Sequence, residues 1–242
     1  RDLHNVAHSF PTRRSSGLAL QRAIDAAGRP GEMPALVWLT SAPGHEEACI
    51  AGLESVLGRD VPIVGGSAAD DTVAGGWYLL TRDTSLRDGI VVSALFPTGR
   101  VASTFQSGYS PTDARGVATR AAGRVLHEID GQPAAAVYNR WSDGAIADAL
   151  HGGSVLASTT LAPIGRRVGD VGGIPYYRLA HPATVHPDGS IELFADITVG
   201  DELVLMQGDP EALVTRAGRV AADARALARI APSDIAGALV IF

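Results

Sequence analysis

Residues 65–71, with the sequence GGSAADD, have the residue types of a loop that binds a small polar molecule. The two glycines allow the backbone to approach a ligand closely or to adopt a positive φ, and the two aspartates can receive an ammonium group or a cation. The segment follows a short predicted strand, Pro62–Val64, and ligands of open α/β sheets bind at the carboxyl ends of strands. The alternative is a tight turn with solvated aspartates. The candidate binding residues of this loop are Gly65, Gly66, Ser67, Asp70 and Asp71.

A second candidate is Arg178, which lies in a strand-like run between Tyr177 and Leu179. Its guanidinium presents a planar fork that suits a carboxylate. An amino acid carries both signs of charge, so Arg178 opposite Asp70 or Asp71 would bind one. The alternative is an arginine that points to water from a strand with one wet face.

Aromatic side chains offer a third candidate. Tyr138 and Trp141 are three residues apart in a predicted helix, so they share a face and either wall a pocket or belong to the core. Tyr109, before Ser110–Pro111, is expected at a pocket rim.

One histidine has the sequence context of a haem ligand. An axial ligand needs an apolar cavity, and strand alternation groups His127 with Val125 and Ile129 on one face. The chain has no CxxCH attachment motif, and a lone histidine among apolar neighbours is usually a core residue. We therefore expect no cofactor and no metal, with haem at His127 as the exception to test.

Catalysis has little support in the sequence. Ser67 lies in GGSAA, which is not the G-x-S-x-G nucleophile elbow. His181 and His186 are five residues apart, which is not a metal-binding spacing on a helix. A hydrolase or amidase that uses Ser67 stays open, because triads assemble from distant residues.

Composition limits the partners. The formal net charge of −6 argues against nucleic acid and anionic membrane surfaces. All 20 basic residues are arginine, which removes lysine Schiff-base chemistry and the Walker lysine. One cysteine, Cys49, cannot build an internal disulfide, and no apolar run approaches the roughly 20 residues that cross a bilayer. We expect a cytoplasmic protein.

The first residues of the chain have an unusual sequence. Residues His8–Leu18 read HSFPTRRSSGL, which resembles the translation of a common sequencing-adapter oligonucleotide. The alternative is a basic arm in which Arg13 and Arg14 bind an acidic partner. We expect residues 1–17 to be non-native and the fold to start near Leu18.

The candidate residues are positioned by an α/β pattern. An alanine-rich helix at Leu18–Ala27, an apolar strand at Ala35–Thr40 and a helix at Gly44–Leu57 precede the glycine-rich loop. These patterns predict an α/β fold of layered helices on mixed β-sheets. The remaining expected strands are Trp77–Thr81, Gly89–Phe96, Val101–Gly108, Gly116–Ile129, Tyr176–Ala180, Ala183–Val185, Ile191–Ile197, Glu202–Gln207 and Ala238–Phe242. The remaining expected helices are Pro133–Trp141, with a continuation at Ala145–Leu150, and Pro210–Ile230, capped by Asp209.

We expect two intimately packed halves, residues 18–150 and 151–242. The helix and strand of Leu18–Thr40 are echoed by Val214–Phe242, where a helix, Pro232 and ALVIF follow one another. The echo indicates either a pseudo-repeat or a coincidence.

Several ordered stretches resemble the bacterial FIST family of sensory domains. They are VPIVGGSAADD at residues 61–71, FQSGYSPTDARGVATRAAGRVLHEIDGQPAAAVYNRW at 105–141, TLAPIG at 160–165, YYRLAHPATVHPDGSIELFADITVGDELVLMQGD at 176–209 and PSDIAGALVIF at 232–242. The resemblance covers residues 18–242, as the FIST N half and part of the FIST C half.

The resemblance implies a cytoplasmic signal-input domain that binds a small molecule such as an amino acid. It also implies an output partner, such as a kinase, a cyclic-nucleotide enzyme or a chemotaxis module. One branch of the family is a haem-binding nitric-oxide sensor, which is the alternative. In the family a cysteine-arginine motif and about a hundred more residues follow the terminal strand, so we expect this chain to be truncated at its C-terminus.

Overall fold

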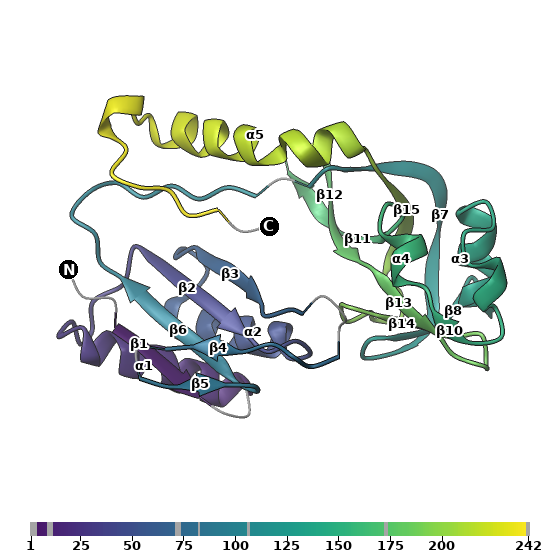
Figure 1. Cartoon of the computed structure of the whole chain (residues 1–242), viewed down its shortest axis with the longest axis horizontal. Helices are drawn as coiled ribbons and strands as arrows, with labels where there is room; N and C mark the ends of the chain where they lie inside the picture. Colours follow the sequence, from purple (N-terminus) through teal and green to yellow (C-terminus); the bar gives the residue numbers. More distant parts are fainter. Residues whose placement is uncertain are drawn as a thin grey trace. The chain divides into compact units, whose positions relative to one another are not determined.

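The computed structural model describes residues 4–8, 12–70, 74–81, 83–105, 107–171 and 174–240. The chain divides into two compact units, Arg1–Phe105 with Val220–Phe242, and Gln106–Arg219 (Figure 1). Each unit has its own sheet and its own hydrophobic core. The predicted boundary after residue 150 falls inside the second unit. Helices on β-sheets confirm the predicted α/β class.

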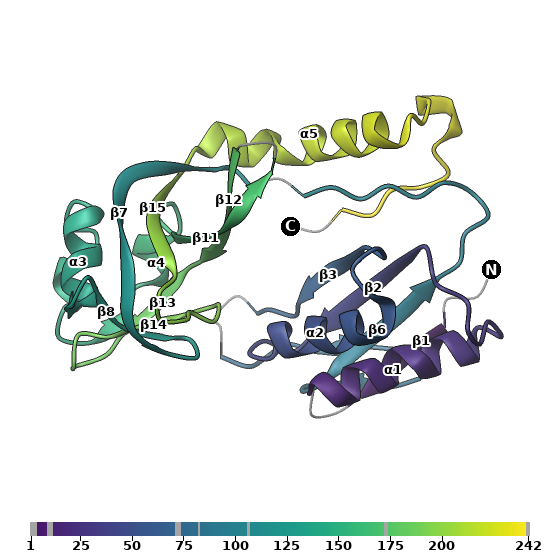
Figure 2. The same cartoon turned by 180° about the vertical axis from the view of Figure 1, so that it is seen from behind.

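The first unit contains, within the described residues, a four-stranded sheet of order β1-β6-β2-β3, in which only β2 and β3 are parallel. Helices α1 and α2 lie side by side on one face of this sheet (Figure 2). The short hairpin β4-β5 packs through Leu79 against Ala42 and Val91 on the other face. The bounds are β1 His4–His8, α1 Arg13–Ala26, β2 Leu36–Ser41, α2 Glu46–Leu57, β3 Ile63–Ser67, β4 Leu79–Leu80, β5 Ser85–Leu86 and β6 Ile90–Leu95.

Alternation along the central strands builds the first core. Every second residue of β2 and β6 faces the helices, where Leu20 of α1 and Leu53 of α2 are fully buried. The strand residues that join them are Val37, Leu39, Ile90, Val92 and Ala94. Strands covered on both faces read as continuous apolar runs, which explains why β2 and β6 were predictable.

Helix α1 begins at Arg13, so the expected start of the fold near Leu18 is wrong. Thr12 and Ser15 form a capping box, which satisfies backbone N–H groups at the helix start. Gly17 is buried against α2: a Cβ there would lie 3.1 Å from the Gly52 carbonyl oxygen and 3.2 Å from Val56. Residues 13–17 are therefore part of the packed helix. The adapter origin of residues 1–17 stays a prediction.

The second unit contains, in the part of the chain described, a nine-stranded antiparallel sheet of order β10-β13-β14-β8-β7-β15-β11-β12, with β9 paired to β8. Its core centres on Tyr138 of α3. The strands are β7 Tyr109–Ala122, β8 Val125–Ile129, β9 Gln132–Pro133, β10 Gly153–Ser154, β11 Ile164–Val171, β12 Ile174–Ala180, β13 Pro182–Val185, β14 Ile191–Leu193 and β15 Glu202–Gly208. The helices are α3 Ala134–Trp141, the 3-10 turn η1 Ala147–Ala149, α4 Leu156–Thr159, α5 Pro210–Ala228, which continues into the first unit, and the 3-10 turn η2 Pro232–Asp234.

Strand β7 joins the two parts of this sheet. Its first nine residues pair with β15, and its last residues, from Ala118 onward, pair with β8. The turn from β8 to β9 has positive φ at Asp130 and Gly131, as expected for an Asp-Gly hairpin turn. Asp209 caps α5 by accepting hydrogen bonds from the backbone N–H groups of Glu211 and Ala212, as predicted.

Several predicted element boundaries are wrong. Residues 101–105, 107 and 108 form no strand, and the single segment predicted at 116–129 is two strands, β7 and β8, joined at the positive-φ Gly123. Strand β14 ends at Leu193 instead of Ile197. The helix over 133–141 ends at Trp141, and only the 3-10 turn η1 forms within 145–150.

The predicted buried strand at Ala238–Phe242 is also wrong as far as the described residues reach. Residues 238–240 have no regular structure, and Leu239 is 72% exposed. A strand needs a neighbour that pairs with its backbone N–H and C=O groups, and residues 238–240 have none among the described strands. Residues 241 and 242 lie outside the described part of the chain.

The structure does not show the echo as a repeat. Helix α1 buries six residues and leads into the buried strand β2, whereas α5 buries none and leads into an exposed segment. The shared composition of the two segments therefore does not give the same packing.

Candidate functional site

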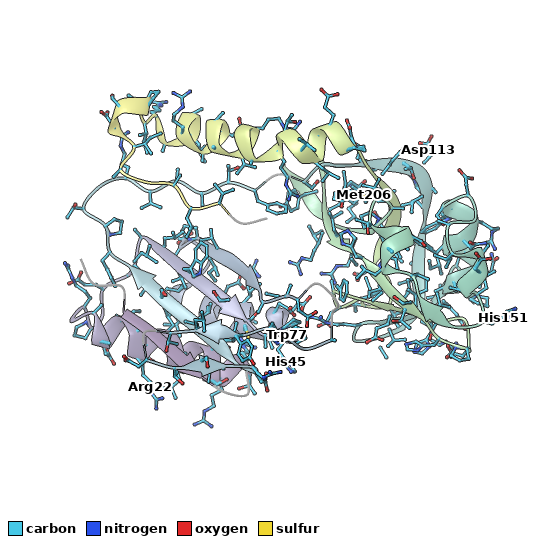
Figure 3. All side chains as sticks on the ribbon, in the orientation of Figure 1. Arg22, His45, Trp77, Asp113, His151 and Met206 are labelled. Atoms are coloured by element: carbon cyan, nitrogen blue, oxygen red, sulfur yellow. The ribbon has the colours of Figure 1, made fainter. Side chains whose placement is uncertain are left out.

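The second unit holds a pocket of about 460 Å³ that is open to solvent. It lies where the end of α3, a bulge in β7, strand β15 and the segment before β11 meet. Met206 on β15 and Asp113 on β7 mark this part of the unit (Figure 3). The lining residues are Thr112, Ala114, Trp141, Ser142, Asp143, Leu161, Ala162, Leu205, Met206, Gln207 and Gly208.

The bulge in β7 forms one wall. Val204 pairs with Arg115 and Met206 with Pro111, so residues 112–114 of β7 lie opposite the single residue Leu205 of β15. The Thr112 hydroxyl donates to the Leu205 carbonyl oxygen at 2.9 Å and fixes the bulge. Proline lacks a backbone N–H and is tolerated at bulges, which explains why the ladder breaks here.

Strand β15 forms the floor, and the segment before β11 holds its other edge. The backbone N–H of Met206 donates to Pro163 O at 2.8 Å, and that of Gly208 donates to Leu161 O at 2.7 Å. A Cβ on Gly208 would lie 2.9 Å from Tyr109 and 3.0 Å from Leu161. Glycine is therefore required at position 208 because both side chains pack against its backbone.

Helix α3 positions the third wall. Tyr138 is fully buried, and its hydroxyl donates to the Ala162 carbonyl oxygen at 2.7 Å, which ties the helix to the pocket lining. Burial raises the pKa of this phenol well above its usual value. The sequence predicted that Tyr138 and Trp141 share a helix face and either wall a pocket or belong to the core. Trp141 lines the pocket, whereas Tyr138 is buried in the core, and ligand binding by either residue stays a prediction.

The end of α3 places a carboxylate at the pocket. The Ser142 N–H donates to Tyr138 O at 2.9 Å and the Gly144 N–H to Asn139 O at 2.8 Å, the pattern of a Schellman motif. Asp143 occupies the left-handed position of that motif with φ of +53°, where glycine is usual. Its exposed carboxylate has no hydrogen bond or ion pair with any described residue.

The lining is mostly uncharged. Among the described residues that line the pocket, Asp143 is the only charged one, and none is a histidine, cysteine, lysine or arginine. The other polar groups include the Gln207 carboxamide and the Trp141 indole N–H, neither of which has a hydrogen-bond partner within the described residues. The apolar surface comes from the leucine, alanine and methionine side chains.

Tyr109 and His181 pack together next to the pocket. The Tyr109 hydroxyl donates to Thr160 O at 2.9 Å and lies 3.5 Å from His181 Nε2, with the rings in an edge-to-face arrangement. Burial lowers the pKa of His181. Tyr109 packs against Gly208, which lines the pocket, but does not line the pocket itself. Its predicted place at a pocket rim stays a prediction.

The glycine-rich loop belongs to the first unit, and its two glycines are part of strand β3. Gly65 pairs with Leu39 and Gly66 with Thr40 in the parallel ladder of β2 and β3. A Cβ on Gly65 would lie 1.7 Å from the Leu39 carbonyl oxygen, so this glycine admits a neighbouring strand.

The polar residues of that loop contact its own neighbours. Ser67 donates a short hydrogen bond to the Glu46 carboxylate. Asp70 accepts hydrogen bonds from the backbone N–H groups of Ala74 and Gly76. Asp71 lies outside the described residues. Ligand binding at this loop stays a prediction.

Arg178 lies on β12 in the second unit, directly opposite Arg166 on β11. Arg166 is paired with Asp201 at 3.3 Å, whereas Arg178 is exposed and has no partner among the described residues. Asp70 and Arg178 belong to different units. Their pairing around an amino acid therefore remains a prediction.

His127 does not have the surroundings of a haem ligand. Arg120 pairs with Glu128 and Ala121 with Leu126, so His127 is the extra residue of a β-bulge and the predicted apolar face is wrong. Its Nδ1 is buried without a hydrogen-bond partner and lies 3.8 Å from Asp188 Oδ2, a charged neighbour. The described residues around His127 therefore do not fit haem. The described residues also contain no group of three or more histidine, cysteine, aspartate or glutamate side chains that could hold a metal ion.

Sequence reasoning missed most of the pocket. Asp143, Met206 and Gln207 come from separate segments, and nothing in their local patterns joins them. One signal was present: Ser142–Gly144 after a helix indicates a C-cap. Pro111 lies between the predicted strands Val101–Gly108 and Gly116–Ile129, so its position in the sequence was no reason to expect a bulge there.

The fold and pocket define an α/β protein with a pocket that is open to solvent. The FIST N domain matches residues 3–132 and the FIST C domain matches residues 134–242. The chain belongs to the FIST family, whose domains are sensory domains of signalling proteins. Because the FIST C match reaches residue 242, it gives no support to the expectation of a truncated C-terminal half.

One relative is an uncharacterized protein of Methanocaldococcus jannaschii, 34% identical over 88 residues, which are 36% of this chain and 17% of that protein. The chain thus matches less than a fifth of the relative's length. No solved structure matches the chain. None of the described helices is both long and apolar enough to span a membrane.

Proposed function

We propose that this chain is the input domain of a signalling protein and that the pocket beside Trp141 binds the small molecule that it senses. The observation that supports this proposal is the pocket itself, about 460 Å³ within one unit, with an apolar floor and three polar groups free to bind. Pockets of 300–1,000 Å³ with mostly apolar walls and a few polar groups are typical of small-molecule sites.

The hydrogen bonding of Ser67, outside this pocket, also supports a binding role over hydrolysis. Ser67, the candidate nucleophile, donates its hydrogen bond to Glu46, and no described histidine is hydrogen-bonded to it. Sensing requires a ligand with different affinities for two conformations, and it needs no catalytic groups.

The resemblance-based ligand is an amino acid, and this stays a second candidate. An amino acid needs a cation for its carboxylate, and the pocket lining has none. Its candidate residues remain Asp70, Asp71 and Arg178. Loss of an amino-acid response in Arg178→Gln, with wild-type stability, would support that location.

We further propose, from family membership, a cytoplasmic domain with an output partner such as a kinase, a cyclic-nucleotide enzyme or a chemotaxis module. The experiment for this part is affinity purification of the natural full-length protein from its cells. Recovery of no signalling protein would contradict it.

A thermal-melt screen tests the pocket. The chain is mixed with the twenty amino acids, a panel of amines, carboxylates and neutral aromatic compounds, and haem. A ligand at 100 times its dissociation constant that binds only the folded state adds about 2.7 kcal/mol, which raises the melting temperature by roughly 5–10 °C.

Two variants of β7 locate the response. Ala114→Trp fills the pocket from the bulge, whereas Ala122→Trp places the same side chain at an exposed position outside the lining. We expect the ligand shift to disappear in the first variant and to persist in the second. An equal shift in both variants, or no shift with any compound, would show that this pocket is not the sensory site.

A further inference from the structure

We infer that the pocket recognises an organic cation, an ammonium group on an apolar body, between the Asp143 carboxylate and the Trp141 ring. This inference rests on the proposed function, because it names the chemical class of the ligand for the same pocket. The charge of the lining is the first observation: of the described residues that line the pocket, Asp143 alone is charged.

The position of Asp143 is the second observation. It follows α3 in the left-handed conformation that closes the Schellman motif, with φ of +53°. Glycine adopts this conformation at no steric cost, whereas an aspartate does so at a cost. The carboxylate has no hydrogen bond or ion pair with a described residue that would offset this strain. An ion pair with a bound cation would offset it.

Trp141 supplies the second half of the cation site. It lies two residues before Asp143, at the last position of α3, and its partly buried side chain lines the same pocket. Cations are attracted to the face of an indole ring, and quaternary or primary ammonium groups are bound by such rings in proteins. A carboxylate next to the ring adds a charge-assisted hydrogen bond for a primary ammonium.

The floor of the pocket suits the apolar body of the ligand. Leu205 and Met206 are almost fully buried in β15, and the thioether of methionine adapts to irregular apolar shapes. Leu161 is 44% exposed at the opposite side, where a ligand would cover it.

An anionic ligand is disfavoured by the same residues. A carboxylate in this pocket would approach Asp143 with no arginine to neutralise it. Arg140 is near in sequence, but its guanidinium donates to Gln132 at 2.9 Å and to the Ala136 carbonyl oxygen at 3.4 Å, and it does not line the pocket.

Matched probes test the charge requirement. Isothermal titration calorimetry with the whole chain uses 2-phenylethylamine, its neutral N-acetyl derivative and the anion 3-phenylpropionate, which share one ring and a similar length. We expect the amine to bind about 10- to 100-fold more tightly than the other two, as a charge-assisted hydrogen bond provides.

Two substitutions test the residue. Asp143→Asn keeps the size and the tolerance for the left-handed conformation, and Asp143→Gly restores the residue that is usual there, so both variants should fold. We expect each to weaken amine binding about 10- to 100-fold and to leave the neutral probe unchanged. Asp113→Asn is the control, because this exposed carboxylate lies between the lining residues Thr112 and Ala114 but is itself outside the lining, and the variant should bind the amine normally.

The outcomes separate the two proposals. If a neutral or anionic probe binds as tightly as the amine, or Asp143→Asn leaves amine binding intact, the cation inference is wrong. The proposed function would still stand if Ala114→Trp abolished that binding. If no probe binds at millimolar concentration, the cation inference is wrong. The thermal-melt screen then decides whether the pocket binds any small molecule.

Discussion

Replacement of Gly65 by alanine distinguishes a packing role of the glycine-rich segment from a binding role. The added Cβ would lie 1.7 Å from the Leu39 carbonyl oxygen and 2.7 Å from its carbonyl carbon, in the middle of the β2–β3 ladder. Ordinary contact begins near 3.4 Å, so either the central strand β2 or the edge strand β3 must move by more than 1 Å. The φ of +148° adds backbone strain.

The expected cost follows from these two causes. Overpacking costs about 1–3 kcal/mol, and an unfavourable backbone conformation costs about 1–2 kcal/mol. We therefore expect Gly65→Ala to lose about 2–5 kcal/mol of unfolding free energy in urea denaturation followed by circular dichroism. Gly99→Ala is the control, since a Cβ there meets nothing within 4 Å and its φ is ordinary.

The control variant should stay within about 0.5 kcal/mol of the parent chain. If Gly65→Ala were equally stable, β2 and β3 could not lie as close as described. Gly65 would then be explained better by the close approach of a ligand to its backbone, as the sequence analysis suggested.

Two further predictions concern Tyr138 and His181, which lie next to the residues that line the pocket. Tyr138→Phe should lose about 1–2 kcal/mol of unfolding free energy, because the Ala162 carbonyl oxygen loses its donor. In the exposed control, Tyr176→Phe, the loss should stay below about 0.5 kcal/mol, and equal losses would contradict the buried hydrogen bond. Burial lowers the pKa of His181 below 6.5, so the unfolded chain binds more protons and stability should fall as the pH drops below about 6.5. His181→Gln should reduce that loss in melts from pH 7.5 to 5, and an unchanged pH dependence would rule out His181 as its source.

The fold was predictable where local pattern and packing agree. The apolar run of β2 has strand length and is covered on both faces, and Asp209–Pro210 marks the start of α5 with a cap. The apolar residues 238–240 show the limit of this reasoning. Their composition resembles that of β2, but a strand exists only where another strand pairs with it, and this is not encoded in the run itself.

The site was less predictable because it depends on irregularities. Helical spacing, which is a local property, predicted that Trp141 shares a face with Tyr138, and its part in ligand binding stays a prediction. Asp143 and Met206 meet at one pocket only because β7 bulges and α3 ends in a Schellman motif. A bulge of one residue at His127 likewise exchanged the faces of β8, so alternation placed that histidine on the wrong side.

Helix α5 starts two residues after Gly208, at the edge of the pocket floor, and none of its 19 residues is buried. At 1.5 Å per residue such a helix is a rod of about 28 Å. Residues 210–219 of this rod belong to the second unit and residues 220–228 to the first. A small adjustment of β15 around a ligand would therefore act at the start of a single helix that both units share.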